Sequence, residues 1–63
     1  MYYVLKAETA KETVYYMNII CITEQIDCAE HFPTYEDAED KKGCFSCMFY
    51  YEQPKITIEK VEK

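Results

Sequence analysis

Three stretches of the sequence have the alternation, or the β-branched and aromatic composition, that is typical of β-strands. The first, Tyr2–Glu8, alternates with Tyr3, Leu5 and Ala7 on one face, and the last, Lys55–Val61, directs two isoleucines to the same face. Between them, Val14–Thr23 is rich in Ile, Val and Tyr and is apolar on both faces. The polar segment Thr9–Thr13 joins the first two and is long enough for a hairpin loop. The pattern therefore predicts three strands.

One helix is expected, and its start is well marked. Pro33 keeps the residue before it extended, and Thr34 is a suitable N-cap, because its hydroxyl can accept a hydrogen bond from a backbone N–H of the first turn. Four acidic residues follow in the first turns, where the helix dipole favours negative charge. They are Glu36, Asp37, Glu39 and Asp40. We therefore predict that the helix begins directly after Thr34.

The end of this helix depends on how Gly43 is interpreted. A glycine inside a helix costs about 1 kcal/mol, and a glycine can equally end one. In the second case Cys44–Tyr51 would form a strand, followed by a tight turn at Gln53 and Pro54. Proline is unsuited to that turn because it cannot adopt a positive φ. We therefore predict a continuous helix to about Tyr51, roughly 27 Å long at the standard rise.

The order of these elements predicts an α+β protein with the succession ββαβ, in which residues 1–63 form a single domain. The helix carries the chain back across the sheet, so the last strand pairs beside the first and antiparallel to it. The predicted sheet is three-stranded and antiparallel, with strand order 2-1-3. One helix packs on one of its faces, with Phe45 and Phe49 directed toward the sheet.

This arrangement leaves apolar surface uncovered on the outer side of the helix and on the second face of the sheet. Contiguous exposed apolar surface marks interaction sites, and a second subunit would stabilise so short a chain. We therefore expect a homodimer and a partner-binding surface on the helix. Its predicted residues are Glu36, Glu39, Asp40, Cys47, Met48 and Tyr51. Alternatively, the helix is rotated from the predicted phase and its apolar residues complete the core.

Composition and charge narrow the classes of partner. The chain has 63 residues, of which 49% are hydrophobic, and a net charge of -5. This charge argues against binding to a nucleic-acid backbone and fits contact with a basic surface on another protein. The longest apolar run, Ile19–Ile22, is too short to span a bilayer. No signal peptide is recognisable, so we expect a cytoplasmic protein with reduced thiols.

The four cysteines allow zinc binding as an alternative, because four thiolates can form a tetrahedral site. They are Cys21, Cys28, Cys44 and Cys47. Only the last two are closely spaced, and a redox-active pair requires a helix N-terminus, which lies well upstream. Free thiols that behave as small apolar side chains are therefore expected, with no cofactor. His31 is the only histidine and has no third group to orient it, so no catalytic site is predicted and the protein is expected not to be an enzyme.

The chain contains AEHFPTYEDAE before the helix and KITIEKVE at its end, after strands of the type YYVLKAE and VYYMN. This succession resembles a pattern common in very small proteins of bacteriophages and mobile elements, with Ala29, Phe32, Thr34 and Ala38 at the start of the helix. The resemblance implies the same fold but supplies no site residues. It also implies a non-enzymatic inhibitor that contacts a host antiviral defence protein in the host cytoplasm. The alternative is a zinc-stabilised structural or interaction module.

Overall fold

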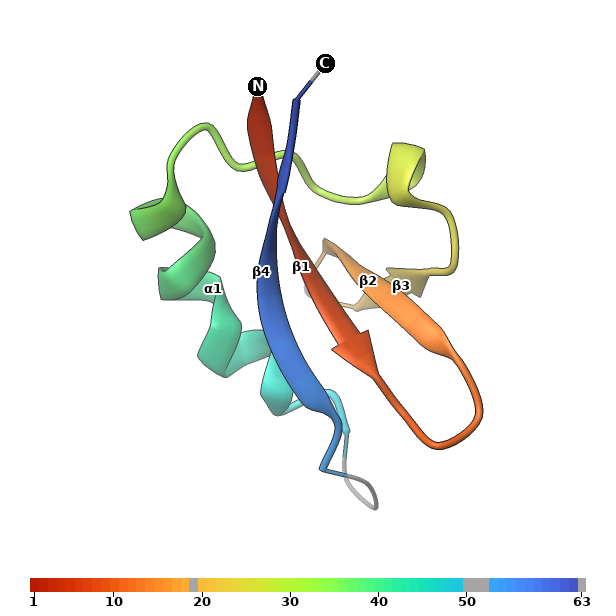
Figure 1. The fold of residues 1–63 in the computed structure, drawn as a ribbon. Coiled ribbons are helices and arrows are strands. Elements are labelled where there is room, and N and C mark those ends of the chain that lie inside the picture. The colour runs from red at the N-terminus through yellow and green to blue at the C-terminus, as the bar shows by residue number, and fades with distance from the viewer. Residues whose placement is uncertain (19, 50–52, 63) are drawn as a thin grey trace.

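A four-stranded antiparallel sheet and one helix form the fold (Figure 1). The computed structural model describes residues 1–18, 20–49 and 53–62. Its elements follow the chain in the order β1, β2, β3, the short 3-10 helix η1, α1 and β4. Their bounds are β1 Tyr2–Glu8, β2 Thr13–Asn18, β3 Cys21–Thr23, η1 Ile26–Cys28, α1 Tyr35–Ser46 and β4 Lys55–Val61. The α+β class and the helix on one face of the sheet are thus confirmed.

The strands lie side by side in the order β3-β2-β1-β4. The first strand is central, as predicted, and β4 pairs with it antiparallel along its whole length, from Tyr2 opposite Val61 to Glu8 opposite Lys55. On the other side, β2 pairs antiparallel with the last three residues of β1. The predicted order 2-1-3 therefore matches β2-β1-β4, and β3 is an additional strand beside β2 at the other edge.

The predicted strand Val14–Thr23 is wrong as a single element, because it folds back on itself as the β2–β3 hairpin. Asn18 lies opposite Cys21, and a register shift separates this pair from the regular pairs that precede it in β2. The Asn18 side-chain oxygen accepts a hydrogen bond from the Ile20 N–H at 2.9 Å. Asparagine commonly starts turns in this way, because its side chain replaces a backbone acceptor.

The helix begins where the sequence predicts. Thr34 has an extended backbone, and its hydroxyl accepts a hydrogen bond from the Asp37 N–H at 3.1 Å. Gly43 lies inside α1, which confirms the helical interpretation of this residue. The strand that the alternative placed over Cys44–Tyr51 is wrong as far as the described residues reach, since Cys44 and Ser46 belong to the helix.

The predicted end of the helix near Tyr51 is wrong, because α1 ends at Ser46. Two tighter turns follow, in which Met48 N–H donates to the Phe45 carbonyl and Phe49 N–H to the Ser46 carbonyl. Twelve helical residues span about 18 Å, close to the roughly 23 Å that a seven-residue strand covers. Beyond these turns, Phe49 packs against Phe45, with ring centroids 5.4 Å apart.

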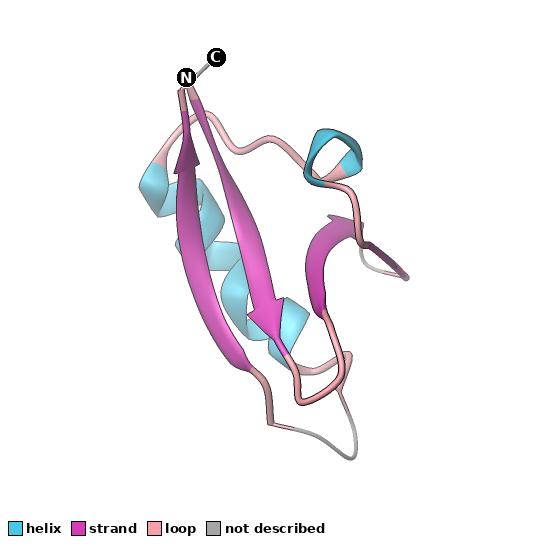
Figure 2. Ribbon diagram, turned by 45° about the vertical axis from the view of Figure 1, so that its right-hand side comes forward, coloured by secondary structure: helices cyan, strands magenta, loops and turns pink. Residues whose placement is uncertain are grey.

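The core lies between α1 and the sheet, and Figure 2 shows the helix on one side of the strands. Phe45 is fully buried and packs edge-on against Tyr16, with ring centroids 5.6 Å apart. Ile56, Ile58 and Phe49 are half-buried against the same core, which confirms the predicted packing of the helix on the sheet. The buried residues of this core are Leu5, Ala7, Val14, Tyr16, Phe32, Ala38 and Phe45.

Candidate functional site

The N-terminal half of α1 presents a strongly acidic surface, which we define by Glu36, Asp37, Glu39 and Asp40. All four side chains are exposed. Within the described part of the chain none of them forms an ion pair. Tyr35 lies directly before them and is 52% exposed, although its ring contacts Tyr3 edge-on at 6.0 Å. The acidic surface therefore carries charge that no ion pair among the described residues neutralises, beside a partly exposed aromatic ring.

Three of the predicted partner-binding residues lie on this acidic surface: Glu36, Glu39 and Asp40. Cys47 is also exposed, but it follows the last turn of α1 and is the C-cap of the helix. Met48 was expected on the outer side and instead packs, half-buried, against the core. It does so because the helix has already ended and the chain turns toward the sheet. Tyr51 lies outside the described residues.

The structure does not bring the four cysteines together. All four are exposed and free. Across residues 1–18, 20–49 and 53–62, no group of three or more His, Cys, Asp or Glu side chains could hold a metal ion. Cys44 and Cys47 lie at the C-terminal end of α1, whereas a redox-active pair is expected at a helix N-terminus. The arrangement of the four cysteines therefore does not provide the four-thiolate zinc site of the alternative interpretation.

His31 stacks on the ring of Tyr2, with centroids 3.8 Å apart and an interplanar angle of 18°. This contact arises because the segment before the helix runs beside β1: Tyr3 and Phe32 exchange two backbone hydrogen bonds of 2.8 and 2.9 Å. The neighbouring thiol, Cys28 Sγ, lies 3.7 Å from the Gln25 side-chain oxygen. The histidine thus has a packing role against β1.

The face of the sheet opposite α1 carries an ion-paired cluster beside the fully buried Val4, which pairs with Glu59. Lys6 Nζ lies 3.4 Å from a carboxylate oxygen of Glu8 and 3.8 Å from Glu59 Oε2. The hydrogen bond to Glu8 and the charge of Glu59 raise the pKa of Lys6 above its usual 10.5. The apolar residues that the sequence places on this face are therefore covered to different extents: Tyr2 and Val61 are half-buried, and Val4 is fully buried.

The β2–β3 hairpin exposes aliphatic residues that the sequence interpretation placed in a continuous strand. Ile20 is 81% exposed, Ile22 is 41% exposed and Met17 is 37% exposed. Single exposed apolar side chains are common on protein surfaces, whereas several close together can mark an interaction site. These three lie within six sequence positions of one another in one hairpin. The signal that could have revealed them is Asn18, a turn-forming residue inside an otherwise apolar run.

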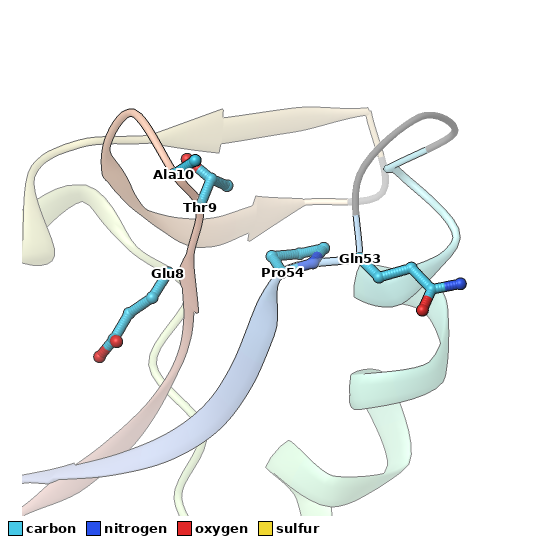
Figure 3. Close-up of a pocket in the computed structure, with 5 residues that line it drawn as sticks. All are labelled: Glu8, Thr9, Ala10, Gln53 and Pro54. Atoms are coloured by element: carbon cyan, nitrogen blue, oxygen red, sulfur yellow. The ribbon is translucent and has the colours of Figure 1, made fainter.

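A shallow hollow of about 270 Å³ lies between the β1–β2 loop and the residues that precede β4. Its lining residues are Glu8, Thr9, Ala10, Gln53 and Pro54. Figure 3 shows the Glu8 carboxylate and the Gln53 amide directed away from one another. Ligand pockets are usually about 300 Å³ or larger and hold polar groups that converge on the ligand. The hollow is smaller and lacks such convergence, so it is a weaker candidate than the acidic surface.

Comparison with known proteins found no matching family model, no similar curated protein and no similar solved structure. Within the described residues, no helix has the length and apolar character needed to cross a membrane.

Proposed function

We propose that this chain is a small non-enzymatic binding protein, encoded by a phage or mobile element, that inhibits a host antiviral defence protein by direct contact. The observation that carries the proposal is the acidic surface of α1. Its four carboxylates are exposed and have no ion-pair partner within the described part of the chain. Carboxylates that are left unneutralised in this way are available to a basic surface on another molecule.

The net charge of the whole chain also supports binding to a basic surface on another molecule. A net charge of -5 on 63 residues repels nucleic acid and attracts positively charged surfaces over distances of several ångströms. Proteins that recognise foreign nucleic acid need basic grooves for its backbone. The target we propose is therefore a protein with such a groove, which the acidic surface would occupy in place of nucleic acid.

Tyr35 gives the acidic surface an apolar anchor. Tyrosine is enriched among the residues that dominate binding energies, because it buries a large area at a low cost in side-chain entropy. About half of the Tyr35 side chain is available, since the residue is 52% exposed. Charge would thus guide the encounter, and the aromatic ring would contribute to its affinity.

A charge-neutralising pair of variants tests the proposal. The protein is immobilised and used to capture partners from a bacterial lysate, and the double variant Glu36→Gln with Glu39→Gln is compared with Glu24→Gln with Glu30→Gln. All four positions are exposed, and each double variant removes two negative charges. We expect the helix variant to reduce the capture of its target on the order of tenfold, because two interfacial charge pairs are lost. The control variant should capture as much of the target as the unmodified protein does. Capture of the target by the unmodified protein should decrease as salt is added.

The captured protein must then be inhibited by the purified chain. We expect its nucleic-acid-dependent activity to fall as the chain is added, and to fall less with the helix variant than with the control variant. Equal capture by the two double variants, or an undiminished activity of the captured protein, would contradict the proposal. Circular dichroism of each variant shows whether α1 is retained.

A further inference from the structure

The outer edge of β4 is a long, regular strand edge without a neighbour among the described residues. The strand order places β4 at the end of the sheet, and β1 pairs with it on one side only (Figure 2). The backbone N–H and C=O groups that point away from β1 can therefore pair with another strand. Native proteins usually shorten, bend or cover such edges, because they are templates for association.

The register with β1 assigns each β4 side chain to a face of the sheet. Ile56 and Ile58 lie opposite the buried residues Ala7 and Leu5, on the side of α1. Both isoleucines pack against the core but remain half-exposed, because no further strand covers them. Lys55, Thr57 and Glu59 alternate with them and lie on the opposite face.

We propose that β4 pairs antiparallel with β4 of a second copy of this chain, with a two-fold axis at Thr57. The sequence K-I-T-I-E is self-complementary about this residue. Lys55 then lies opposite Glu59 of the second copy, Ile56 opposite its Ile58, and Thr57 opposite its own equivalent. Because the relation is two-fold, each heterotypic pair occurs twice. Opposite charges and β-branched pairs that face one another across two strands are the contacts that stabilise antiparallel sheets.

Other registers lack this match. A two-fold axis perpendicular to the sheet keeps equivalent side chains on the same face, so the axis must pass through a residue position. Moving the axis by one residue then shifts the register by two residues. An axis at Glu59 would place two carboxylates directly opposite one another, and an axis at Ile58 would place Ile56 opposite Lys60. The charges of β4 therefore select the pairing about Thr57.

The two charged groups of this pairing differ in exposure: Lys55 is exposed and Glu59 is half-buried. Lys55 is exposed and forms no ion pair with any other described residue. The Glu59 side chain is 42% exposed overall, although its Oε2 atom is buried without a hydrogen-bond partner among the described residues and lies 3.8 Å from Lys6 Nζ. The lysine of a second copy would thus add a positive charge beside a carboxylate that its own chain satisfies incompletely.

The position of α1 is compatible with this dimer. The helix packs against β1 and β4, and two-fold symmetry places both copies of it on the same face of an eight-stranded sheet. If α1 lies over the β1–β4 pair, the two helices are about two strand spacings apart, roughly 10 Å. This is the distance at which packed helices contact one another, so the helices would add to the interface without a clash.

Charge reversal at Lys55 tests the pairing without touching the core. The mass of the full-length protein is measured by sedimentation equilibrium over a concentration series. We expect the parent to dimerise and Lys55→Glu to weaken the dimer on the order of tenfold or more, because two attractive pairs become repulsive. Lys60→Glu is the matched control: it makes the same charge change on the same strand but lies on the other face, opposite Pro54 in the proposed register. This variant should dimerise as the parent does.

The double variant Lys55→Glu with Glu59→Lys restores opposite charges and should recover the dimer. A parent that stays monomeric throughout the series would overturn the proposal, as would equal effects of Lys55→Glu and Lys60→Glu. Failure of the double variant to recover, with its fold shown intact by circular dichroism, would also overturn it. The inference concerns self-association only, so it can fail while the proposed inhibition of a host protein stands.

Discussion

The two edges of the sheet are built differently. At one edge, β4 pairs residue by residue with all seven positions of β1 and rests on α1. At the other edge, β3 has only three residues, and a register shift interrupts its pairing with β2. The half of the molecule that contains β1, β4 and α1 includes the three largest fully buried side chains, Phe45, Leu5 and Val4. The β2–β3 hairpin instead leaves Ile20 and Ile22 exposed.

This difference separates two kinds of contact surface. A long edge without register shifts that is supported by a helix can add a strand through its backbone, and its side chains then determine which strand fits. A short, irregular edge cannot do so, but it can offer exposed aliphatic side chains to a partner. We therefore expect the β4 half to determine self-association. Stability should depend on the core, which includes Val14 and Tyr16 of β2, and little on the exposed residues of the β3 edge.

Truncation of Phe45 should have the largest effect on stability. Its ring is fully buried beneath the sheet, and Phe→Ala changes at such sites cost about 3–5 kcal/mol. Domains of this size rarely have more than about 3–5 kcal/mol of stability, so we expect Phe45→Ala to be largely unfolded in urea titrations followed by circular dichroism. Ile20→Ala at the hairpin should change the free energy of unfolding by less than about 0.5 kcal/mol. Comparable losses in the two variants would contradict the division into two halves.

Loss of the helix cap should have an intermediate effect. Thr34→Ala removes the acceptor for the Asp37 N–H and should lower the free energy of unfolding by about 1 kcal/mol. Thr23 offers a matched comparison at the β3 edge, since its hydroxyl accepts a hydrogen bond from the Gln25 N–H at 3.1 Å. Thr23→Ala should cost less, because no helix depends on that bond. A larger loss at Thr23 than at Thr34 would show that the hairpin carries stability.

A stabilising change of small size is expected at Gly43. The residue lies inside α1, and an added Cβ would meet no heavy atom of another residue within 4 Å. Gly43→Ala should therefore raise the free energy of unfolding by about 0.5–1 kcal/mol, because alanine loses less backbone entropy in a helix. Thermal unfolding measures the change, and no increase in the midpoint would argue that this part of α1 is strained or frayed.

The parts of the fold that could be predicted are those with local signals. A strand-like pattern of alternating faces marks β1 and β4, and Pro33 with Thr34 marks the start of α1. The end of α1 could not be predicted, because Gly43 is tolerated inside the helix and the stop depends on how Phe49 packs in three dimensions. The β2–β3 hairpin was missed because its turn contains no Gly or Pro and its residues favour strands; the side chain of Asn18 forms the turn instead.

In the candidate site too, features with a local sequence signal could be predicted, and features that depend on the three-dimensional structure could not. The acidic residues of α1 were expected on an exposed helix surface and lie there, since their charges exclude them from a core. Met48 was misplaced because its position depends on where the helix ends. The edge of β4 could not be identified before the strand order was known, because a sequence shows that a segment is a strand but not which of its sides lacks a neighbour.

Amide hydrogen exchange at low and high protein concentration compares the two edges directly. If β4 is the self-association edge, the β4 amides that point away from β1 gain protection as concentration rises, while the β3 amides exchange at the same rate throughout. Concentration-dependent protection at β3, or at neither edge, would contradict this account.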